Sequence, residues 1–258
     1  MPNRDGYPNS SLGDEIAKSP PLNKSEHQGF RDFSSIRGNP FVRQFASGPE
    51  RQERQAGPID VLVNNAGYGH EGVLEEPSMD DLQRQFAANV FGSVAMIKAA
   101  LPGMRERRRG HIVNVTSMGG FITMPGIAFY CGSKFALEGI SEALGKEVAD
   151  FGIRVTALAP GQFRTDWAGR SLDRAPRTLA DYDAVMDPIR AARQAKSGNQ
   201  PGDPAKAAQA LLALVDTAYP PVRLFLGDDA LGLVEQKLDR MRAEIDTWDT
   251  LSRSTSFT

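Results

Sequence analysis

Tyr130 and Lys134 have a spacing that suits proton transfer. They lie four residues apart in a predicted helix, so both side chains are expected on the same helical face. A free tyrosine has a pKa of about 10 and is a poor base at neutral pH. An ammonium about 4 Å away contributes about 4 kcal/mol at an effective dielectric near 20, enough to lower that pKa by roughly three units. The pair is therefore predicted to give and take a proton.

Ser117 is a third side chain that belongs with this pair. It precedes Tyr130 by thirteen residues and follows a predicted strand. Open parallel sheets bind their ligands at the carboxyl ends of the strands, where the serine hydroxyl can hydrogen-bond a substrate oxygen. Most Tyr-x-x-x-Lys pairs lie on solvated helix faces, so the serine is the feature that favours a site.

Alternating strands and helices are expected to position these residues. Ser78 and Asp81 form a capping box that begins a long helix, and Asp203-Pro204 begins a later one. The order of the elements predicts an α/β fold with a parallel sheet. The predicted strands are 59–63, 111–115, 153–158 and 222–226, and the predicted helices are 78–107, 128–149, 203–215 and a final one with the apolar stripe Leu231, Val234, Leu238, Met241, Ile245 and Trp248.

Five motifs in order resemble those of the short-chain dehydrogenase/reductase family, in its subgroup of single-domain enzymes of about 250 residues. The similarity runs from about Gly57 to the carboxyl end. The segment Asp166-Trp-Ala-Gly-Arg-Ser and the final helix resemble bacterial members that are similar to hydroxysteroid and retinol dehydrogenases. The motifs are Asn64-Asn65-Ala66-Gly67, Asn89 in Asn-Val-Phe-Gly, Ser117, Tyr130-Cys-Gly-Ser-Lys134, and Pro160-Gly161 with Thr165.

The resemblance implies an oxidoreductase that interconverts a secondary alcohol and a carbonyl with NAD or NADP. Tyr130 is then the general acid/base, Lys134 lowers its pKa and holds the nicotinamide ribose, Ser117 orients the substrate oxygen, and Asn89 holds a water that links Lys134 to solvent. The family also implies a Rossmann-like doubly wound sheet, and a homodimer or homotetramer packed through helices 78–107 and 128–149. The implied cofactor-binding residues are Asn65, Ala66, Gly67, Tyr130, Lys134, Pro160, Gly161, Phe163 and Thr165.

Residues 1–57 depart from the family pattern. They contain only five Val, Ile or Leu, against fourteen in 58–117, and no two of their glycines are closer than seven apart. No glycine-rich phosphate-binding turn is present there, so the sheet is expected to lack or distort its first strands. We expect 1–57 to be a poorly ordered segment and 58–258 to be the catalytic domain. A rival interpretation is a truncated, non-catalytic family member that cannot bind a dinucleotide and acts by oligomerisation or has no function.

The remaining glycine and histidine patterns do not indicate a binding site. Gly67-x-Gly69-x-x-Gly72 follows a predicted strand, but the next helix begins only at Ser78. A dinucleotide fingerprint must open a helix directly, so we predict that this segment is a loop. His27, His70 and His111 lack metal-ligand spacing, so no metal is expected. Residues 162–202 show no clean period and are expected to close over a small apolar substrate. Four of their apolar side chains suggest such a ligand: Phe163, Trp167, Leu172 and Tyr182.

Composition limits the partners and the compartment. The chain has 258 residues, a formal net charge of −2, 24% charged residues and a single cysteine, Cys131. No basic field is available for a nucleic acid or an anionic membrane, and the basic cluster at Arg105–Arg109 suits a helix carboxyl end. One cysteine cannot form an internal disulfide, which fits a reducing compartment. A cytoplasmic protein is expected, with Cys131 in packing or lining the site.

Overall fold

The computed structural model describes residues 57–169 and 171–257, and its main sheet has four parallel strands in the order β1-β3-β4-β6. These strands are β1 (Val61–Asn64), β3 (Gly110–Val115), β4 (Ile153–Pro160) and β6 (Arg223–Leu226). Two short strands, β2 (Gly69–Glu71) and β5 (Leu172–Arg174), form a separate parallel pair. The predicted parallel α/β sheet is confirmed. Expectations for residues 1–56 lie outside the described residues.

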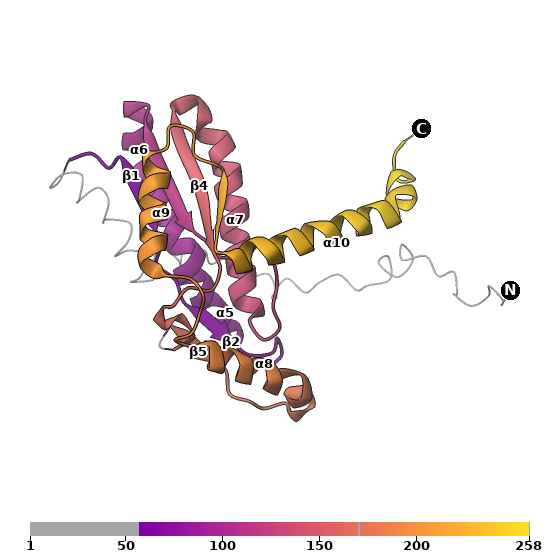
Figure 1. Cartoon of the computed structure of the whole chain (residues 1–258). Coiled ribbons are helices and arrows are strands. Elements are labelled where there is room, and N and C mark those ends of the chain that lie inside the picture. The colour runs from indigo at the N-terminus through magenta and orange to yellow at the C-terminus, as the bar shows by residue number, and fades with distance from the viewer. Residues whose placement is uncertain (1–56, 170, 258) are drawn as a thin grey trace, which may run out of the picture. The chain divides into compact units, whose positions relative to one another are not determined.

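Helices cover both faces of the sheet (Figure 1). The long helical stretch consists of α5 (Met79–Phe86), a π-helical turn (Ala87–Phe91) and α6 (Gly92–Arg107). It packs on the sheet beside α7 (Ala128–Val148), and α9 (Pro204–Asp216) covers the opposite face. The other helices are α8 (Asp183–Lys196), α10 (Asp228–Arg253) and 3₁₀ turns at Met118–Gly120, Ala149–Phe151, Asp166–Ala168 and Ala180–Tyr182.

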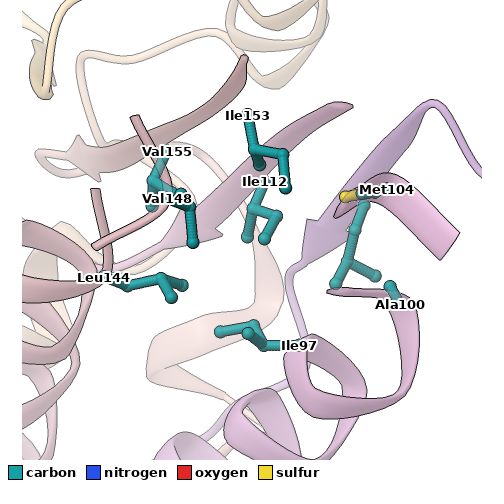
Figure 2. Close-up of a cluster of buried hydrophobic side chains, with 9 residues drawn as sticks. Ile97, Ala100, Met104, Ile112, Leu144, Val148, Ile153 and Val155 are labelled. Carbon is teal, nitrogen blue, oxygen red and sulfur yellow. The ribbon is translucent and has the colours of Figure 1, made fainter. Parts of the chain in front are cut away.

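Alternate residues of the strands build the core on either face. Ile112 of β3 points to the α6 and α7 side, whereas Val113 packs with Leu158 and Leu214 toward α9. Burial of such side chains contributes roughly 1.5–3 kcal/mol each. Figure 2 shows the larger cluster, in which residues of α6 and α7 meet those of β3 and β4: Ile97, Ala100, Met104, Ile112, Leu144, Val148, Ile153 and Val155.

The stretch Met79–Arg107 is long and apolar enough, by length and composition alone, to cross a membrane. In the fold it supplies Ile97, Ala100 and Met104 to the core, which is the ordinary reason for such a composition in a buried helix. The predicted capping box is present, since the Ser78 hydroxyl accepts from the Asp81 N–H and the Asp81 carboxylate accepts from the Ser78 N–H.

Two regions differ from the sequence-based expectation. Residues 162–202 are not a plain loop, because they contain β5 and the fourteen-residue helix α8. The segment Gly67–Gly72 begins no helix, as expected, but it includes β2 rather than being loop throughout. The final helix forms as predicted, yet of its stripe only Val234 is buried and Leu238 to Trp248 are exposed.

Candidate active site

The carboxyl ends of β1, β3 and β4 open into a cavity of about 820 Å³, a size typical of small-molecule and cofactor sites. Most of the predicted site residues line it, although Ala66 and Asn89 do not. Those in the lining are Asn65, Gly67, Ser117, Tyr130, Lys134, Pro160, Gly161, Phe163 and Thr165.

Ser117 sits directly after β3, where it caps the short 3₁₀ turn Met118–Gly120. Its Oγ accepts a hydrogen bond of 3.0 Å from the Gly119 N–H. A Cβ placed on Gly119 would lie 3.2 Å from Cε1 of Tyr130 and 3.4 Å from Oγ of Ser117. The turn therefore brings the serine hydroxyl and the tyrosine ring together, and its glycine permits that close approach.

Tyr130 lies in the first turn of α7 and is almost completely buried. Burial raises the pKa of Tyr130 to about 12, with a hydrogen bond from the Ser117 side chain acting in the opposite direction. The spacing of Tyr130 and Lys134 predicted that the ammonium lowers the pKa of the tyrosine, and this prediction is wrong for the structure. The ammonium lies 5.9 Å from the ring centroid, while the phenol is shielded from water, so desolvation of the phenolate dominates.

Lys134 follows one helical turn later on the same face. Its Nζ donates a 2.9 Å hydrogen bond to the carbonyl oxygen of Val115, at the end of β3. Burial lowers the pKa of Lys134 to about 8, and the negative charge of Glu138 opposes that change. The lysine thus titrates close to the physiological range, unlike an exposed lysine.

Asn89 lies in the π-helical turn and is fully buried. Its Nδ2 donates to the Tyr68 carbonyl oxygen (3.0 Å) and to Oγ of Ser133 (2.9 Å), and its Oδ1 accepts from the Tyr68 N–H (3.0 Å). These bonds join the loop after β1 to α7. A Cβ on Gly67 would approach Asn89 Oδ1 at 3.0 Å and Lys134 Nζ at 3.5 Å, so the same loop passes directly over the lysine.

The segment after β4 forms another wall of the cavity. The Gly161 N–H donates to the Leu226 carbonyl oxygen, and the Gln162 N–H donates to the Asp229 carboxylate at the start of α10. A Cβ on Gly161 would overlap that carboxylate, which explains the need for glycine there. Pro160, the last residue of β4, and Phe163 flank these two residues and line the cavity.

The sequence did not identify the wall that α8 contributes. Ile189, Ala192, Arg193 and Lys196 all line the cavity, and their i, i+3, i+4, i+7 spacing is a helical signal. Pro188 and the polar surroundings hid that period. Of the apolar residues expected near a substrate, Phe163 and Trp167 line the cavity; Leu172 is buried against Gly69, and the Tyr182 hydroxyl donates to Glu75.

The buried carboxylate of Glu71 fastens α8 to β2. Arg193 donates to it and also to the Pro125 carbonyl oxygen, and Arg174 and Arg190 lie 3.9 Å from it.

A second polar cluster joins β2, α5 and β5. One side-chain atom each of His70, Asp81 and Asp173, of the kind that can bind a metal ion, lie within 4.8 Å of one another. Asp81 already serves the helix cap and pairs with Arg84.

Comparison with known proteins agrees with this geometry. A family profile described as short chain dehydrogenase matches residues 44–175. The chain is 37% identical over 214 residues to oxidoreductase BOA17 of Botryotinia fuckeliana, covering 83% of this chain and 76% of that relative.

Two solved structures share the fold. A short-chain dehydrogenase from Streptomyces avermitilis has a TM-score of 0.77 and 38% identity, covering 83% of this chain and 78% of that one. A gluconate 5-dehydrogenase from Burkholderia cenocepacia, in complex with NADP and tartrate, has a TM-score of 0.59 and 25% identity, covering 74% and 72%. The profile match, the relative and the shared fold together place this chain in the short-chain dehydrogenase family.

Proposed function

We propose that this chain is an oxidoreductase that interconverts a secondary alcohol and a carbonyl by hydride transfer with NAD or NADP. One observation carries the proposal: the Ser117 side chain hydrogen-bonds that of Tyr130 at the wall of the cavity, and Lys134 lies one helical turn away with its ammonium 5.9 Å from the centre of the tyrosine ring. Two hydroxyl donors beside one open space suit a carbonyl oxygen that gains negative charge during reduction. Family membership supports the same reaction class.

Protonation supports particular roles for these side chains. Because the pKa of Tyr130 is raised to about 12, its phenol is protonated at neutral pH and can donate a proton to the substrate oxygen. Ser117 orients and polarises that oxygen by a hydrogen bond. Protonated Lys134 places a positive charge beside the tyrosine and favours the phenolate that forms when the proton leaves.

The cavity also suits a nicotinamide dinucleotide. Its volume of about 820 Å³ exceeds the need of a small alcohol, and it is lined by a buried glutamine, Gln200, whose Oε1 has no hydrogen-bond partner among the described residues. When bound, the cofactor supplies or accepts the hydride. We assign Asn65, Gly67, Lys134, Pro160, Gly161, Phe163 and Thr165 to hold it; Ala66 adjoins this wall without lining the cavity.

Apolar side chains form much of the remaining wall, which favours a small apolar alcohol or carbonyl as substrate. Trp167 packs on Tyr130 with ring centroids 5.1 Å apart, and Met124, Ile127 and Ile189 line the same cavity. From the charge balance and the single cysteine we further propose a cytoplasmic protein that binds neither nucleic acid nor membrane. From the family resemblance we propose a homo-oligomer packed through helices 78–107 and 128–149.

A second function is kept because the glycine-rich turn is absent from residues 1–57. A non-catalytic family member that cannot hold a dinucleotide would retain Asn89, Ser117, Tyr130 and Lys134 as a remnant. Titration of the full chain with NADPH and, separately, NADH, followed by nicotinamide fluorescence, distinguishes the two. Saturable binding of either cofactor supports the enzyme, whereas no binding at millimolar concentration supports the non-catalytic alternative.

A further inference from the structure

Glu138 is a buried carboxylate that joins three elements around the candidate active site. It lies on α7, and only 4% of it is exposed. The Thr116 hydroxyl, at the end of β3, donates to Oε1 at 2.5 Å, and Nε of Arg223, on β6, donates to Oε2 at 2.6 Å. Buried charges are costly unless they are paired and hydrogen-bonded, and both requirements are met here.

This carboxylate also adjoins the residues of the proposed reaction. Thr116 immediately precedes Ser117, and Glu138 follows Lys134 by one helical turn on the same face. A Cβ on Gly120 would lie 2.9 Å from Cγ of Glu138 and 3.0 Å from the Lys134 carbonyl oxygen. The turn that begins at Ser117 therefore rests directly on the part of α7 that carries Lys134 and Glu138.

The charges around Lys134 come from several elements. On α7 it adjoins Tyr130 and Glu138, and Glu138 acts to raise its pKa against the effect of burial. Arg223 of β6 faces Glu138 and lies 3.7 Å from Glu142. Lys237 of α10 lies over the rings of Phe121 and Phe135, and the Cys131 thiol lies beside Tyr130. Glu138 thus pairs directly with one cation, Arg223, and acts electrostatically on a second, Lys134.

We propose that Glu138 is a positioning residue: its carboxylate ties the strand end that carries Ser117 to the helix that carries Tyr130 and Lys134, and its negative charge, one helical turn from Lys134, acts on the ammonium of that lysine. The inference rests on the proposed function for its effect on turnover. Its electrostatic part concerns residues of this chain alone, and it can be measured without cofactor or substrate.

Two substitutions should move the pKa of Lys134 in opposite directions. Glu138→Gln keeps the shape but removes the negative charge, so the pKa should fall by about one unit. Arg223→Gln removes the competing cation and leaves the Glu138 charge to act on Lys134, so the pKa should rise. A purely structural role of the Glu138–Arg223 pair would impair the site in the same way in both variants.

The experiment measures the pH dependence of Lys134 acylation in the full chain by residue-resolved mass spectrometry. Relative to the wild type, the midpoint should move to lower pH in Glu138→Gln and to higher pH in Arg223→Gln. Glu142→Gln, one turn further along α7, is the matched control and should leave the midpoint within a few tenths of a unit. An unchanged midpoint in both variants, or a move in the same direction, overturns the proposal.

Turnover provides the second readout. In carbonyl reduction, the rate should fall as Lys134 loses its proton with rising pH, and that fall should move with the acylation midpoint in each variant. If the acylation midpoints move but the wild type has no turnover, the proposed function fails while the charge coupling stands. If the wild type turns over but the midpoints do not move, Glu138 has no such role.

If Glu138→Gln does not fold, Arg223→Gln and Thr116→Val carry the test. Thr116→Val should leave the acylation midpoint of Lys134 unchanged, because it keeps both the Glu138 and the Arg223 charge.

Discussion

At the scale of single residues, burial rather than the neighbouring ammonium decides the protonation of the candidate acid. Tyr130 has a pKa raised to about 12, and Lys134 has one lowered to about 8. Both changes follow from removing charged forms from water. In this state the tyrosine holds the proton that it would give to a carbonyl oxygen in the proposed reduction.

Replacement of Ser117 by Ala should lower kcat of carbonyl reduction by roughly 10² to 10³, the usual effect of losing one donor to a developing oxyanion. The loss should appear in kcat and kcat/KM alike, because the bond strengthens as charge develops. Steady-state kinetics at saturating cofactor measure it. Cys131→Ser is the control, since that thiol is buried and burial raises its pKa; a Ser117→Ala enzyme as active as this control would remove the serine from the mechanism.

At the scale of elements, His111 shows how the interior of the sheet depends on pH. Its ring is buried on β3, and Nε2 lies 3.0 Å from the Thr156 hydroxyl on β4. Burial lowers the pKa of His111 to about 4, with Arg154 acting in the same direction. The unfolded chain therefore binds this proton at higher pH than the folded chain does.

The free energy of unfolding should consequently decrease as the pH falls from about 6.5 to about 4, by roughly 3 kcal/mol from this residue alone. His111→Gln cannot take up that proton and should lose this part of the pH dependence. Urea unfolding of the two proteins at several pH values gives the difference directly. Equal slopes for wild type and variant over that range would show that His111 does not contribute.

The helix α8 should depend on the buried carboxylate of Glu71. Glu71→Gln leaves Arg193 without its charge partner in a partly buried place, a change that typically costs several kcal/mol locally. Faster amide exchange over 183–196 and a higher KM are expected. Asp187→Asn, on the same helix, is the control. Asp187 is half exposed and pairs with Arg177 at 2.7 Å and with Arg190 at 3.6 Å rather than with Arg193, so its effect should be about 0–1 kcal/mol. Equal exchange in the two variants would count against the prediction.

Sequence patterns predicted elements whose signals are local. The Ser78–Asp81 cap, the short β-branched strands and the Pro204 helix start all formed where expected. The same patterns missed α8, where Pro188 interrupts a mostly polar helix, and the π-helical turn that holds Asn89, because that turn depends on contacts with Tyr68 and Ser133. The network of Glu138 was also out of reach, since Thr116 and Arg223 are distant from it in sequence.

At the scale of the whole molecule, assembly is predicted from the family resemblance. The chain retains both helical stretches that the family packs about twofold axes, 78–107 and 128–149. In addition, α10 extends away from the sheet (Figure 1). It leaves four large apolar side chains exposed at helical spacing, Leu238, Met241, Ile245 and Trp248, and such an apolar stripe commonly marks an interaction surface.

We therefore expect a homodimer or homotetramer at micromolar concentration. Sedimentation equilibrium measures the mass without a standard, and the monomer mass of 28.0 kDa is the reference value. A mass of two or four chains agrees with the prediction. A single species at the monomer mass over the whole concentration range would show that the resemblance does not extend to assembly.

Turnover by the wild type and by Tyr130→Phe tests the central claim most directly. Oxidation of NADPH or NADH is followed by absorbance with a panel of small apolar carbonyl compounds, each at saturating cofactor. Tyr130→Phe keeps the ring that packs on Trp167 and removes the proton donor. We predict turnover by the wild type and a rate lower by a factor of roughly 10² to 10⁴ in Tyr130→Phe, with nearly unchanged cofactor affinity. Equal rates in the two proteins, with cofactor bound, would contradict the assignment of Tyr130 as the acid.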